Sequence, residues 1–365
     1  MNAFNTDIRS QSLLLNGTSF QATDRASLIS TLREEGPDSF ASSLATFLEE
    51  WFDNSPTVTV HTSGSTGTPK LMRVEKRRMM NSACMTIAFL GLQPGDNTLL
   101  CMPLKYIAGK MVVVRALVGG LNLIPVTPCG HPLSSTGNPL HFAAMTPMQA
   151  FNSLQTQEEA IRLQHVKQLI IGGGAINPSL EKALKDFPEN VWSTYGMTET
   201  LSHIALRRLN GTSASAWYTP LQGVRLSLST KGTLVIDAPA VAASTLVTND
   251  LAELRPDGTF RILGRMDNTI NTGGVKVQIE EVEEILRPYL SLPFLITSIP
   301  DPRLGERIVL LTEGSSDDPS LQEACANLHP YKRPKEIVHV THIPLTGTGK
   351  PDRAVAKEMA AEACR

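Results

Sequence analysis

Hydrophobic positions recur along this chain with two different spacings, and the spacing changes from segment to segment. Short apolar runs, typical of buried strands, cover residues 99–102, 121–126, 142–145, 168–171 and 191–193. Between them lie segments such as 108–118 and 178–185, in which apolar residues return every three or four positions, as in helices. This alternation predicts an α/β fold built from layers of sheet and helix.

The two ends of the chain differ from this central region. A short strand at 13–15 precedes one amphipathic helix predicted from about 25 to 51, and the alternating run at 57–60 predicts another strand. Short strands and turns follow residue 223. Beyond residue 267, helices at 280–286 and 321–328 and strands at 294–299, 307–311 and 336–340 predict a small α+β module. We expect a large domain over residues 1–264, a connection at 265–267 and a small domain over 268–365.

The composition excludes several classes of protein. The chain has 365 residues, of which 41% are hydrophobic and 19% charged, and its formal net charge of −2 gives no electrostatic reason to expect nucleic acid as a partner. No apolar run approaches the ~18 residues that cross a bilayer, and no signal peptide is visible. The five scattered cysteines lack a CxxC pair. They disfavour a disulfide framework or a zinc site and fit a cytoplasmic protein.

Residues 61–70, His-Thr-Ser-Gly-Ser-Thr-Gly-Thr-Pro-Lys, concentrate glycines, hydroxyls and one lysine between two strand-like runs. Backbone N–H groups and hydroxyls in such a loop can surround an anion, and the lysine can neutralise its charge. The lysine precedes the alternating run 71–74, whereas a Walker A lysine stands at the start of a helix. The loop therefore predicts a polyphosphate site of another kind.

Four further segments carry residue types that a nucleotide site needs. Residues 171–175 run from a strand into glycines, which let a flat ring approach the backbone. Residues 193–200, Ser-Thr-Tyr-Gly-Met-Thr-Glu-Thr, offer an aromatic face, hydroxyls and a carboxylate suited to Mg²⁺. Asp250 and Arg265 belong to one later segment, made of residues 247–250 and 264–267, and Lys350 lies in a glycine-rich last segment. The glycine turn at 171–175 and an aspartate such as Asp250 are common by themselves, whereas the Tyr-Gly-Met-Thr-Glu motif at 195–199 is highly specific when it occurs with the other segments in this order.

In this order the five segments resemble the adenylate-forming family, which comprises acyl-CoA synthetases, luciferases and nonribosomal adenylation domains. The resemblance covers most of the chain after residue 57. It implies a large domain of layered β-sheets and helices followed by a small mobile α+β lid domain. It also implies ATP, Mg²⁺ and coenzyme A as ligands. A carboxylate would attack the α-phosphate of ATP, and the CoA thiol would then displace AMP from the acyl-adenylate.

The resemblance assigns roles to individual residues. The expected contacts of ATP and AMP are Thr62, Ser63, Gly64, Ser65, Thr66, Gly67, Lys70, Gly173, Gly174, Ala175, Tyr195, Gly196, Met197, Thr198, Asp250 and Arg265. The expected catalytic residues are Lys350, Thr198 and Glu199, and Glu199 would also hold the metal ion. Asp267 corresponds to the hinge of the lid domain, and Gly273, Gly274 and Lys276 correspond to residues that face CoA.

The segment before the phosphate loop is short for this family, so we expect an N-terminal domain shortened at its start. Residues 102–110, 144–149 and 200–205 resemble ligases for an aromatic dicarboxylate that carries a keto group. The acyl pocket is then expected from Tyr106, Lys110, Thr146, Gly172 and His203, although many such ligases have histidine in place of Tyr106. The carboxylate that is not activated needs a partner. The candidates are Lys105, Lys110, Arg115, His203 and Arg207, and the position of Lys110 favours it.

Other functions stay open at this point. The chain could be another aryl- or acyl-CoA synthetase, or a standalone adenylation domain that loads a carrier protein. A degenerate nucleotide-binding protein is disfavoured because Lys70, Glu199, Asp250, Arg265 and Lys350 are all present. The expected partners are a small carboxylic acid, ATP and CoA, without nucleic acid or a membrane span. A homodimer is one arrangement that the sequence leaves open.

Overall fold

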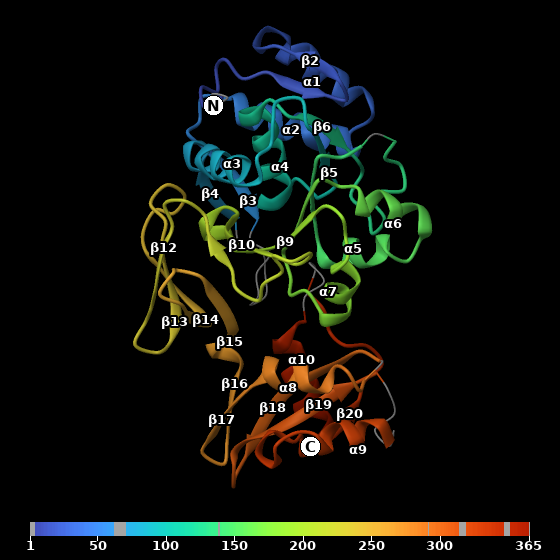
Figure 1. Cartoon of the computed structure of the whole chain (residues 1–365), viewed down its shortest axis with the longest axis vertical. Coiled ribbons are helices and arrows are strands. Elements are labelled where there is room, and N and C mark those ends of the chain that lie inside the picture. The colour runs from blue at the N-terminus through green and yellow to red at the C-terminus, as the bar shows by residue number, and fades with distance from the viewer. Residues whose placement is uncertain are drawn as a thin grey trace.

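A nine-stranded sheet forms the centre of the computed structural model, which describes residues 4–61, 71–137, 139–290, 292–313, 319–346 and 351–364 (Figure 1). Its strand order is β11-β10-β9-β8-β7-β5-β6-β1-β2. The strands from β9 to β1 run parallel, and antiparallel pairs close both ends. The bounds are β1 (Leu13–Leu15), β2 (Thr18–Phe20), β5 (Asn97–Leu100), β6 (Asn122–Pro125), β7 (Phe142–Met145), β8 (Gln168–Ile171), β9 (Asn190–Gly196), β10 (His203–Arg208) and β11 (Thr219–Pro220).

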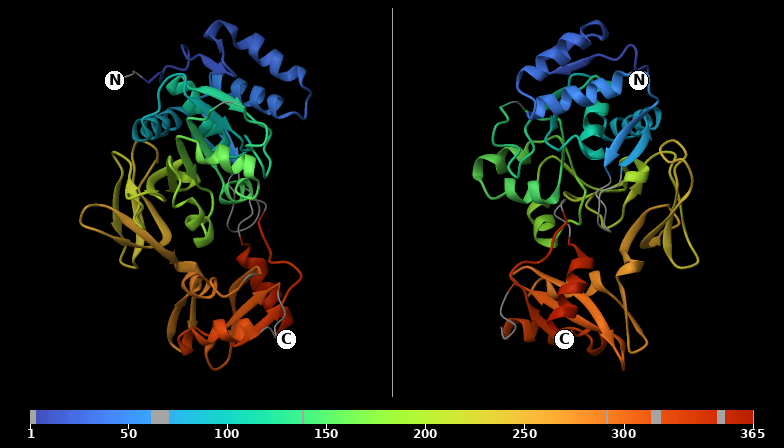
Figure 2. Two further views of the ribbon diagram at one scale, coloured as in Figure 1. Left: turned by 45° about the vertical axis from the view of Figure 1, so that its right-hand side comes forward. Right: turned by 180° about the vertical axis from the view of Figure 1, so that it is seen from behind.

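Helices cover both faces of this sheet, because its central strands bury side chains on both sides. Along β7, Phe142 and Ala144 enter one core while Ala143 and Met145 enter another. The first core includes α1 (Arg25–Glu34), α2 (Phe40–Phe52), α3 (Lys76–Leu90) and α4 (Ile107–Gly119), and the second includes α5 (Pro147–Ser153), α6 (Gln157–Gln164) and α7 (Pro178–Leu184). The three views agree with this layering (Figures 1 and 2).

Two smaller sheets pack beside the large one. Strands β3 (Thr57–His61) and β4 (Leu71–Glu75) form an antiparallel pair whose Val58, Val60 and Val74 enter the first core. A four-stranded antiparallel sheet contains β12 (Arg225–Leu228), β13 (Thr233–Asp237), β14 (Leu246–Leu254) and β15 (Phe260–Arg265). Short 3-10 helices are η1 (Ala22–Asp24), η2 (Thr198–Thr200), η3 (Met266–Asn268) and η4 (Pro330–Lys332).

The C-terminal part has its own sheet and its own cores, and it lies at the lower end of the molecule in Figure 1. Its strands are β16 (Thr269–Thr272), β17 (Val275–Gln278), β18 (Phe294–Asp301), β19 (Gly305–Thr312) and β20 (Glu336–His339). Helices α8 (Ile279–Leu286) and α9 (Pro319–Ala326) share one core with this sheet, and α10 (Arg353–Ala363) shares the other.

The structure confirms the α/β alternation and corrects one predicted helix. Residues 25–51 were expected to form a single helix, but α1 and α2 are separate. Gly36 adopts φ +105° and Pro37 follows it, and neither residue suits a helix interior. Across the described ranges, every helix is too short or too polar to cross a bilayer.

Candidate active site

The carboxyl ends of four parallel strands meet at one edge of the large sheet. The turns that follow β5, β7, β8 and β9 converge there, as open α/β sheets require of ligand sites. A largely apolar cavity of about 580 Å³ lies among these turns. Of the residues predicted for the site, Tyr106, Thr146, Gly172, Gly173, Gly196, Met197, Thr198 and His203 line it. The site is therefore assembled by the sheet and not by neighbours in sequence.

Close backbone packing at the cavity explains why two of these positions are glycine. A Cβ atom on Gly172 would lie 2.1 Å from Oγ1 of Thr194, and one on Gly196 would lie 2.3 Å from the carbonyl oxygen of Ser202. The turn between β9 and β10 is also strained, since Leu201 adopts φ +65°, which side chains other than glycine rarely allow. The turn that contains Gly196 and the strained Leu201 is thus packed tightly where it lines the cavity.

A chain of polar side chains forms the inner wall of the cavity. Nη2 of Arg115 donates to Oγ of Ser202 at 2.7 Å, and Ser202 lies 3.3 Å from Nδ1 of His203. Nε2 of His203 lies 3.1 Å from Oγ1 of Thr86, whose hydroxyl donates to the Ser82 carbonyl. Because the Thr86 hydroxyl donates to that carbonyl, its oxygen acts as the acceptor toward His203. His203 therefore carries its hydrogen on Nε2 and accepts from the Ser202 hydroxyl at Nδ1.

Arg115 is buried without a counter-ion from the described residues. Its exposed fraction is 2%, its Nε atom has no hydrogen-bond partner there, and Arg115 is among the residues that line the cavity. Burial lowers the pKa of Arg115 to about 9. The pKa of His203 falls well below its usual value, first because of burial and then because of the charge of Arg115, so this imidazole is neutral at pH 7. An anion beside Arg115 would relieve an unfavourable buried charge.

The choice of Lys110 for the acyl pocket is wrong. Its Nζ donates to Glu50 at 2.8 Å and to the carbonyl oxygen of Thr59 at 2.7 Å, and Lys110 is not among the described residues that line the cavity. Its ammonium group is thus already neutralised on the far side of α4. Arg207 is similarly occupied, because Glu181 binds it through both carboxylate oxygens. Of the candidate partners for a second carboxylate, Arg115 and His203 are the two that line the cavity.

A second group of predicted residues meets on the opposite face of β9. Thr194 and Gly196 line the cavity, whereas Tyr195 points toward β14, as alternation along a strand requires. The hydroxyl of Tyr195 donates to Oδ2 of Asp250 at 2.6 Å, and its ring packs edge-on against Phe260. Burial, followed by the charge of Asp250, raises the pKa of Tyr195, so the phenol stays protonated. An aromatic ring and a carboxylate lie together here.

Arg265 links this group to the predicted hinge. Its Nε and Nη2 donate to the two oxygens of Asp267 at 2.9 Å each, and its Nη1 lies 3.7 Å from Oδ1 of Asp250. The hydrogen bonds from Arg265 lower the pKa of Asp267. Gly264 adopts φ +149° and leaves no room for a Cβ beside Gln278. The bidentate ion pair and a hydrogen bond of 2.7 Å from Nε2 of Gln278 to the Arg265 carbonyl oxygen both hold the connection into the C-terminal part.

The remaining predicted residues lie apart from the cavity or outside the described residues. Glu199 is exposed on η2, and Gly174 and Ala175 lie beyond the lining. Gly273 and Gly274 form the exposed turn between β16 and β17, and Lys276 is exposed on β17. Outside the described residues lie Thr62, Ser63, Gly64, Ser65, Thr66, Gly67, Lys70 and Lys350.

The donor set suits an ion that is held chiefly by phosphate. Among the described residues no group of three histidine, cysteine or acidic side chains could hold a metal ion by itself. Mg²⁺ usually takes one or two carboxylates together with phosphate oxygens, and Glu199 is an exposed carboxylate next to Thr198. The described part of the site therefore fits a magnesium–nucleotide complex better than a resident metal.

Ser202 and His61 are polar residues of the cavity that the sequence did not single out. Ser202 bridges Arg115 and His203, yet it has no individual signal within residues 200–205. His61 also lines the cavity, because its N–H donates to the carbonyl oxygen of Lys105 at 3.2 Å and ties β3 to the start of α4. Its position as the first residue of the segment 61–70, which the sequence predicts to bind polyphosphate, was a signal that could have found it.

Known proteins match both the sequence and the fold. The sequence pattern of the AMP-binding enzyme family matches residues 16–237. A probable 2-succinylbenzoate–CoA ligase of Mycobacterium tuberculosis is 28% identical over 348 residues, which cover 86% of this chain and 87% of that protein. An acyl-CoA synthetase (AMP-forming)/AMP-acid ligase II-like protein from Dyadobacter fermentans has a TM-score of 0.62 at 31% identity, covering 90% and 96%. The o-succinylbenzoate CoA synthetase of Bacillus subtilis with its acyl-adenylate intermediate has a TM-score of 0.75 at 16% identity, covering 96% of each chain.

Replacing Gly196 tests whether close packing shapes the site. The added methyl group of Gly196→Ala meets backbone atoms of Ser202 and His203, so we expect a loss of about 1–3 kcal/mol in the free energy of unfolding. Gly137→Ala is the matched control, because a Cβ there meets nothing within 4 Å. Urea denaturation of both variants checks this, and equal stability of the two would contradict the packing argument.

Proposed function

The chain belongs to the AMP-binding enzyme family, and from that premise we propose that it converts 2-succinylbenzoate to its CoA thioester in menaquinone biosynthesis. The family and the named CoA ligases among its relatives make it an acid–thiol ligase that forms an acyl-adenylate. The substrate is the proposal. The observation that carries it is Arg115, a buried cation that has no carboxylate partner in the described chain and lines an apolar cavity.

The shape and chemistry of the cavity suit this acid. A volume of about 580 Å³ lies within the usual range for small-molecule pockets, and Met102, Ile107 and Met145 offer apolar walls for an aromatic ring. The carboxylate that is not activated would pair with Arg115. Ser202 and neutral His203 hold that guanidinium in place through the hydrogen-bond chain. A monocarboxylate would leave Arg115 buried and unpaired, which is costly.

We propose that the nucleotide lies between the cavity and the second group of residues. Tyr195 would stack on the adenine, Asp250 would accept the ribose hydroxyls, and Arg265 would approach the ribose or a phosphate. Thr198 would contact the α-phosphate, Gly173, Gly174 and Ala175 would border the base, and Glu199 would hold Mg²⁺, which screens phosphate charge when bound. Residues 62–70 would cover the β- and γ-phosphates.

The two half-reactions follow from these positions. An oxygen of the substrate carboxylate attacks the α-phosphorus, the bond to the bridging oxygen of pyrophosphate breaks, and pyrophosphate leaves. Positioning and charge neutralisation supply most of the catalysis in such transfers, which agrees with a site that lacks a nucleophilic side chain in our assignment. The sulfur of CoA then attacks the acyl carbon and AMP leaves with the bonding electrons.

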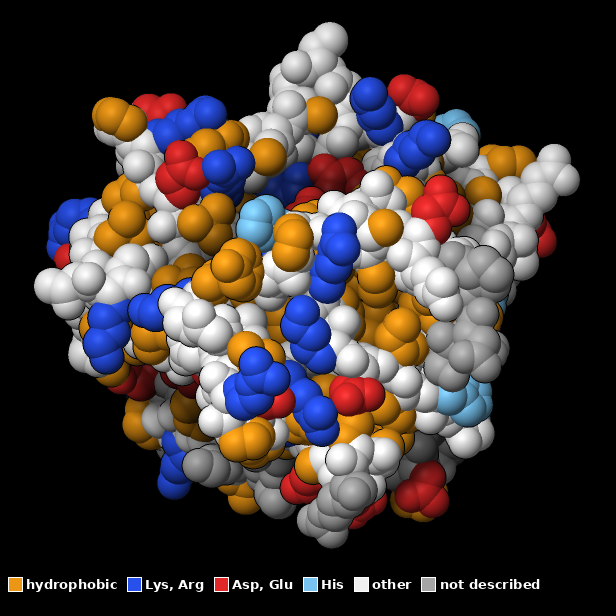
Figure 3. Space-filling model, turned by 90° about the horizontal axis from the view of Figure 1, so that it is seen from below, with side chains coloured by type: hydrophobic (Ala, Val, Ile, Leu, Met, Phe, Trp, Pro, Cys, Tyr) orange, Lys and Arg blue, Asp and Glu red, His pale blue; other side chains and the backbone are white. Residues whose placement is uncertain are grey.

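The C-terminal part would act as the lid. We propose that residues 268–365 rotate about Asp267 between the two steps, so that Lys350 serves adenylation and the turn at Gly273 and Gly274, with Lys276, serves CoA. Breaking and remaking the ion pair between Arg265 and Asp267 would accompany the rotation. Seen from below, lysine and arginine side chains gather near the middle of the surface (Figure 3).

Substrate selection by Arg115 tests the proposed acid. We expect Arg115→Met to lower kcat/KM for 2-succinylbenzoate by about 10- to 100-fold, because one charge-assisted contact is lost. Two analogues each lack one carboxylate: 4-oxo-4-phenylbutanoate and 2-butanoylbenzoate. For whichever of them the enzyme still activates, Arg115→Met should change kcat/KM by less than about threefold. Pyrophosphate release with CoA measures all three acids.

Equal losses on the dicarboxylate and the monocarboxylate would contradict a direct role for Arg115. A wild-type preference for a monocarboxylate would favour another aryl-CoA synthetase. Acyl transfer to a holo-carrier protein in place of CoA would favour a carrier-loading domain. Each outcome is visible in the same assay once the products are identified by mass.

The pH dependence of substrate choice provides a second test. Since kcat/KM reports the free enzyme, the cationic form of Arg115 should be present below pH 9 and lost above it. We expect the ratio of kcat/KM for 2-succinylbenzoate to that for the activated monocarboxylate to fall as pH rises through about 9. Stopped assays between pH 7 and pH 10 measure this ratio. A constant ratio would contradict the lowered pKa.

Replacing Lys350 tests whether this residue acts in adenylate formation and not in thioester formation. We expect Lys350→Ala to slow adenylate formation by about 100-fold or more, because a positive charge at the transferring phosphate is lost. Thioester formation from added acyl-adenylate should continue at close to the wild-type rate. Lys231→Ala, which changes an exposed turn lysine, is the control. Full adenylation activity in Lys350→Ala would refute the assigned role.

A further inference from the structure

The outer edge of β3 is held by side chains at Thr59 and by one backbone contact at His61, whose N–H donates to the Lys105 carbonyl oxygen. In an antiparallel pair, alternate residues turn their N–H and C=O groups away from the partner strand. Thr59 stands opposite Arg73 of β4, and its own N–H donates to Oε1 of Glu50 at 2.5 Å. Its carbonyl oxygen accepts from Nζ of Lys110 at 2.7 Å. Both outward backbone groups of Thr59 are thus satisfied by one ion pair.

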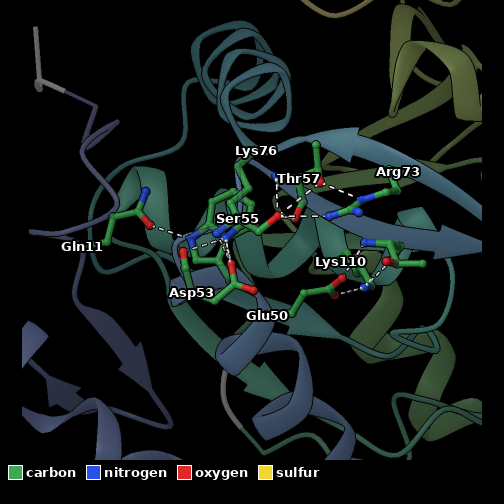
Figure 4. A network of polar contacts seen from close by, with 10 residues as sticks. Gln11, Glu50, Asp53, Ser55, Thr57, Arg73, Lys76 and Lys110 are labelled. Carbon is green, nitrogen blue, oxygen red and sulfur yellow. Dashed lines mark hydrogen bonds and ion pairs between the residues drawn. The ribbon is translucent and has the colours of Figure 1, made fainter.

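This ion pair joins three elements and is largely removed from solvent. Lys110 of α4 and Glu50 of α2 are 2.8 Å apart, with side chains 8% and 28% exposed, and the ammonium of Lys110 lies 4.9 Å from the centre of the Phe47 ring. Figure 4 shows Glu50 and Lys110 pointing toward each other from opposite sides. A buried ion pair is weak evidence for stability, and it is better suited to fixing one arrangement.

The arrangement that the pair fixes is the spacing between β3 and α4. Two residues beyond Thr59, His61 lines the cavity, and its N–H donates to the carbonyl oxygen of Lys105. Residues 62–70, assigned above to the phosphates of ATP, follow directly. On the other side, Tyr106, the N-cap residue of α4, and Arg115 of α4 line the cavity. The pair therefore stands between the strand that leads to the phosphates and the helix that faces the acid.

We propose that Glu50 and Lys110 are positioning residues, which set the edge of β3 against α4 so that MgATP is held in line with the carboxylate. This inference rests on the proposed function only in assigning residues 62–70 to ATP. It gives Lys110 a role that differs from the one expected from the sequence. The role is exerted through the backbone of Thr59 and not through contact with either substrate.

The chain supplies a matched control at the other end of the same hairpin. Lys76 is 2% exposed, and its Nζ donates to Oδ1 of Asp53 at 2.6 Å and to the Asp53 carbonyl oxygen (Figure 4). Lys76 adjoins the end of β4 that lies away from His61. Lys76→Met should therefore destabilise the protein as Lys110→Met does, without moving the end of β3 that precedes residues 62–70.

The test compares MgATP affinity with thermal stability in the full-length protein. Titration calorimetry in the absence of the carboxylic acid substrate gives the Kd for MgATP, and thermal unfolding gives Tm. We expect Lys110→Met to raise the Kd about tenfold, the loss that one hydrogen bond of ordinary strength corresponds to. Lys76→Met should lower Tm while its Kd stays within about twofold of the wild type. Lys110→Met leaves the Glu50 carboxylate without a cation, and the double variant Glu50→Gln with Lys110→Met removes that charge. The Tm of the double variant should therefore be higher than that of Lys110→Met, while its Kd for MgATP stays raised.

Two results would overturn the positioning role. One is an unchanged Kd in Lys110→Met, and the other is a Kd that follows Tm through all four proteins, which a purely structural role predicts. If the wild type itself fails to bind MgATP, the proposed function fails before the variants are compared. The two failures are thus separable, because the wild-type measurement does not involve the ion pair.

Discussion

Parallel pairing of β5, β7, β8 and β9 is the constraint on which the site depends. It brings four turns to one edge of the sheet, and the cavity exists because those turns cannot fill the space between them. Gly172, directly after β8, follows from the same constraint, since a Cβ atom there would meet Oγ1 of Thr194 on the neighbouring β9. The four-stranded sheet then completes the opposite side of β9 by bringing Asp250 to Tyr195.

Helix α4 carries two buried cations, Lys110 with a carboxylate partner and Arg115 without one among the described residues. Lys110 and Arg115 are five residues apart, which is about 140° around a helix, so they face different neighbours. Lys110 is neutralised by Glu50, whereas Arg115 donates to the hydroxyl oxygen of Ser202 and pairs with no carboxylate of the described residues. Because an unpaired buried charge is unfavourable, a buried cation beside a cavity favours the binding of an anionic ligand. This contrast is the physical basis for proposing a dicarboxylate.

Much of this arrangement could be predicted from the sequence, and the failures have definite causes. The glycine and hydroxyl segments followed predicted strands, so their meeting at one edge was foreseeable, and so was the nearness of Tyr195 to Asp250. Arg115 was one of the five candidates for the second carboxylate, but the sequence favoured Lys110, because most of α4 is apolar and its pattern does not show which face meets the cavity. The partner of Lys110 came from α2, a contact 60 residues away in sequence.

The most direct measurement is the reaction of the wild-type protein with 2-succinylbenzoate, MgATP and CoA, followed by pyrophosphate release and by the mass of the product. The account predicts pyrophosphate and an acyl-adenylate without CoA, and one thioester of 2-succinylbenzoate with AMP when CoA is added. It also predicts a higher kcat/KM for this acid than for either analogue that lacks one carboxylate. Faster turnover of a monocarboxylate, or no adenylate from the dicarboxylate, would contradict the account.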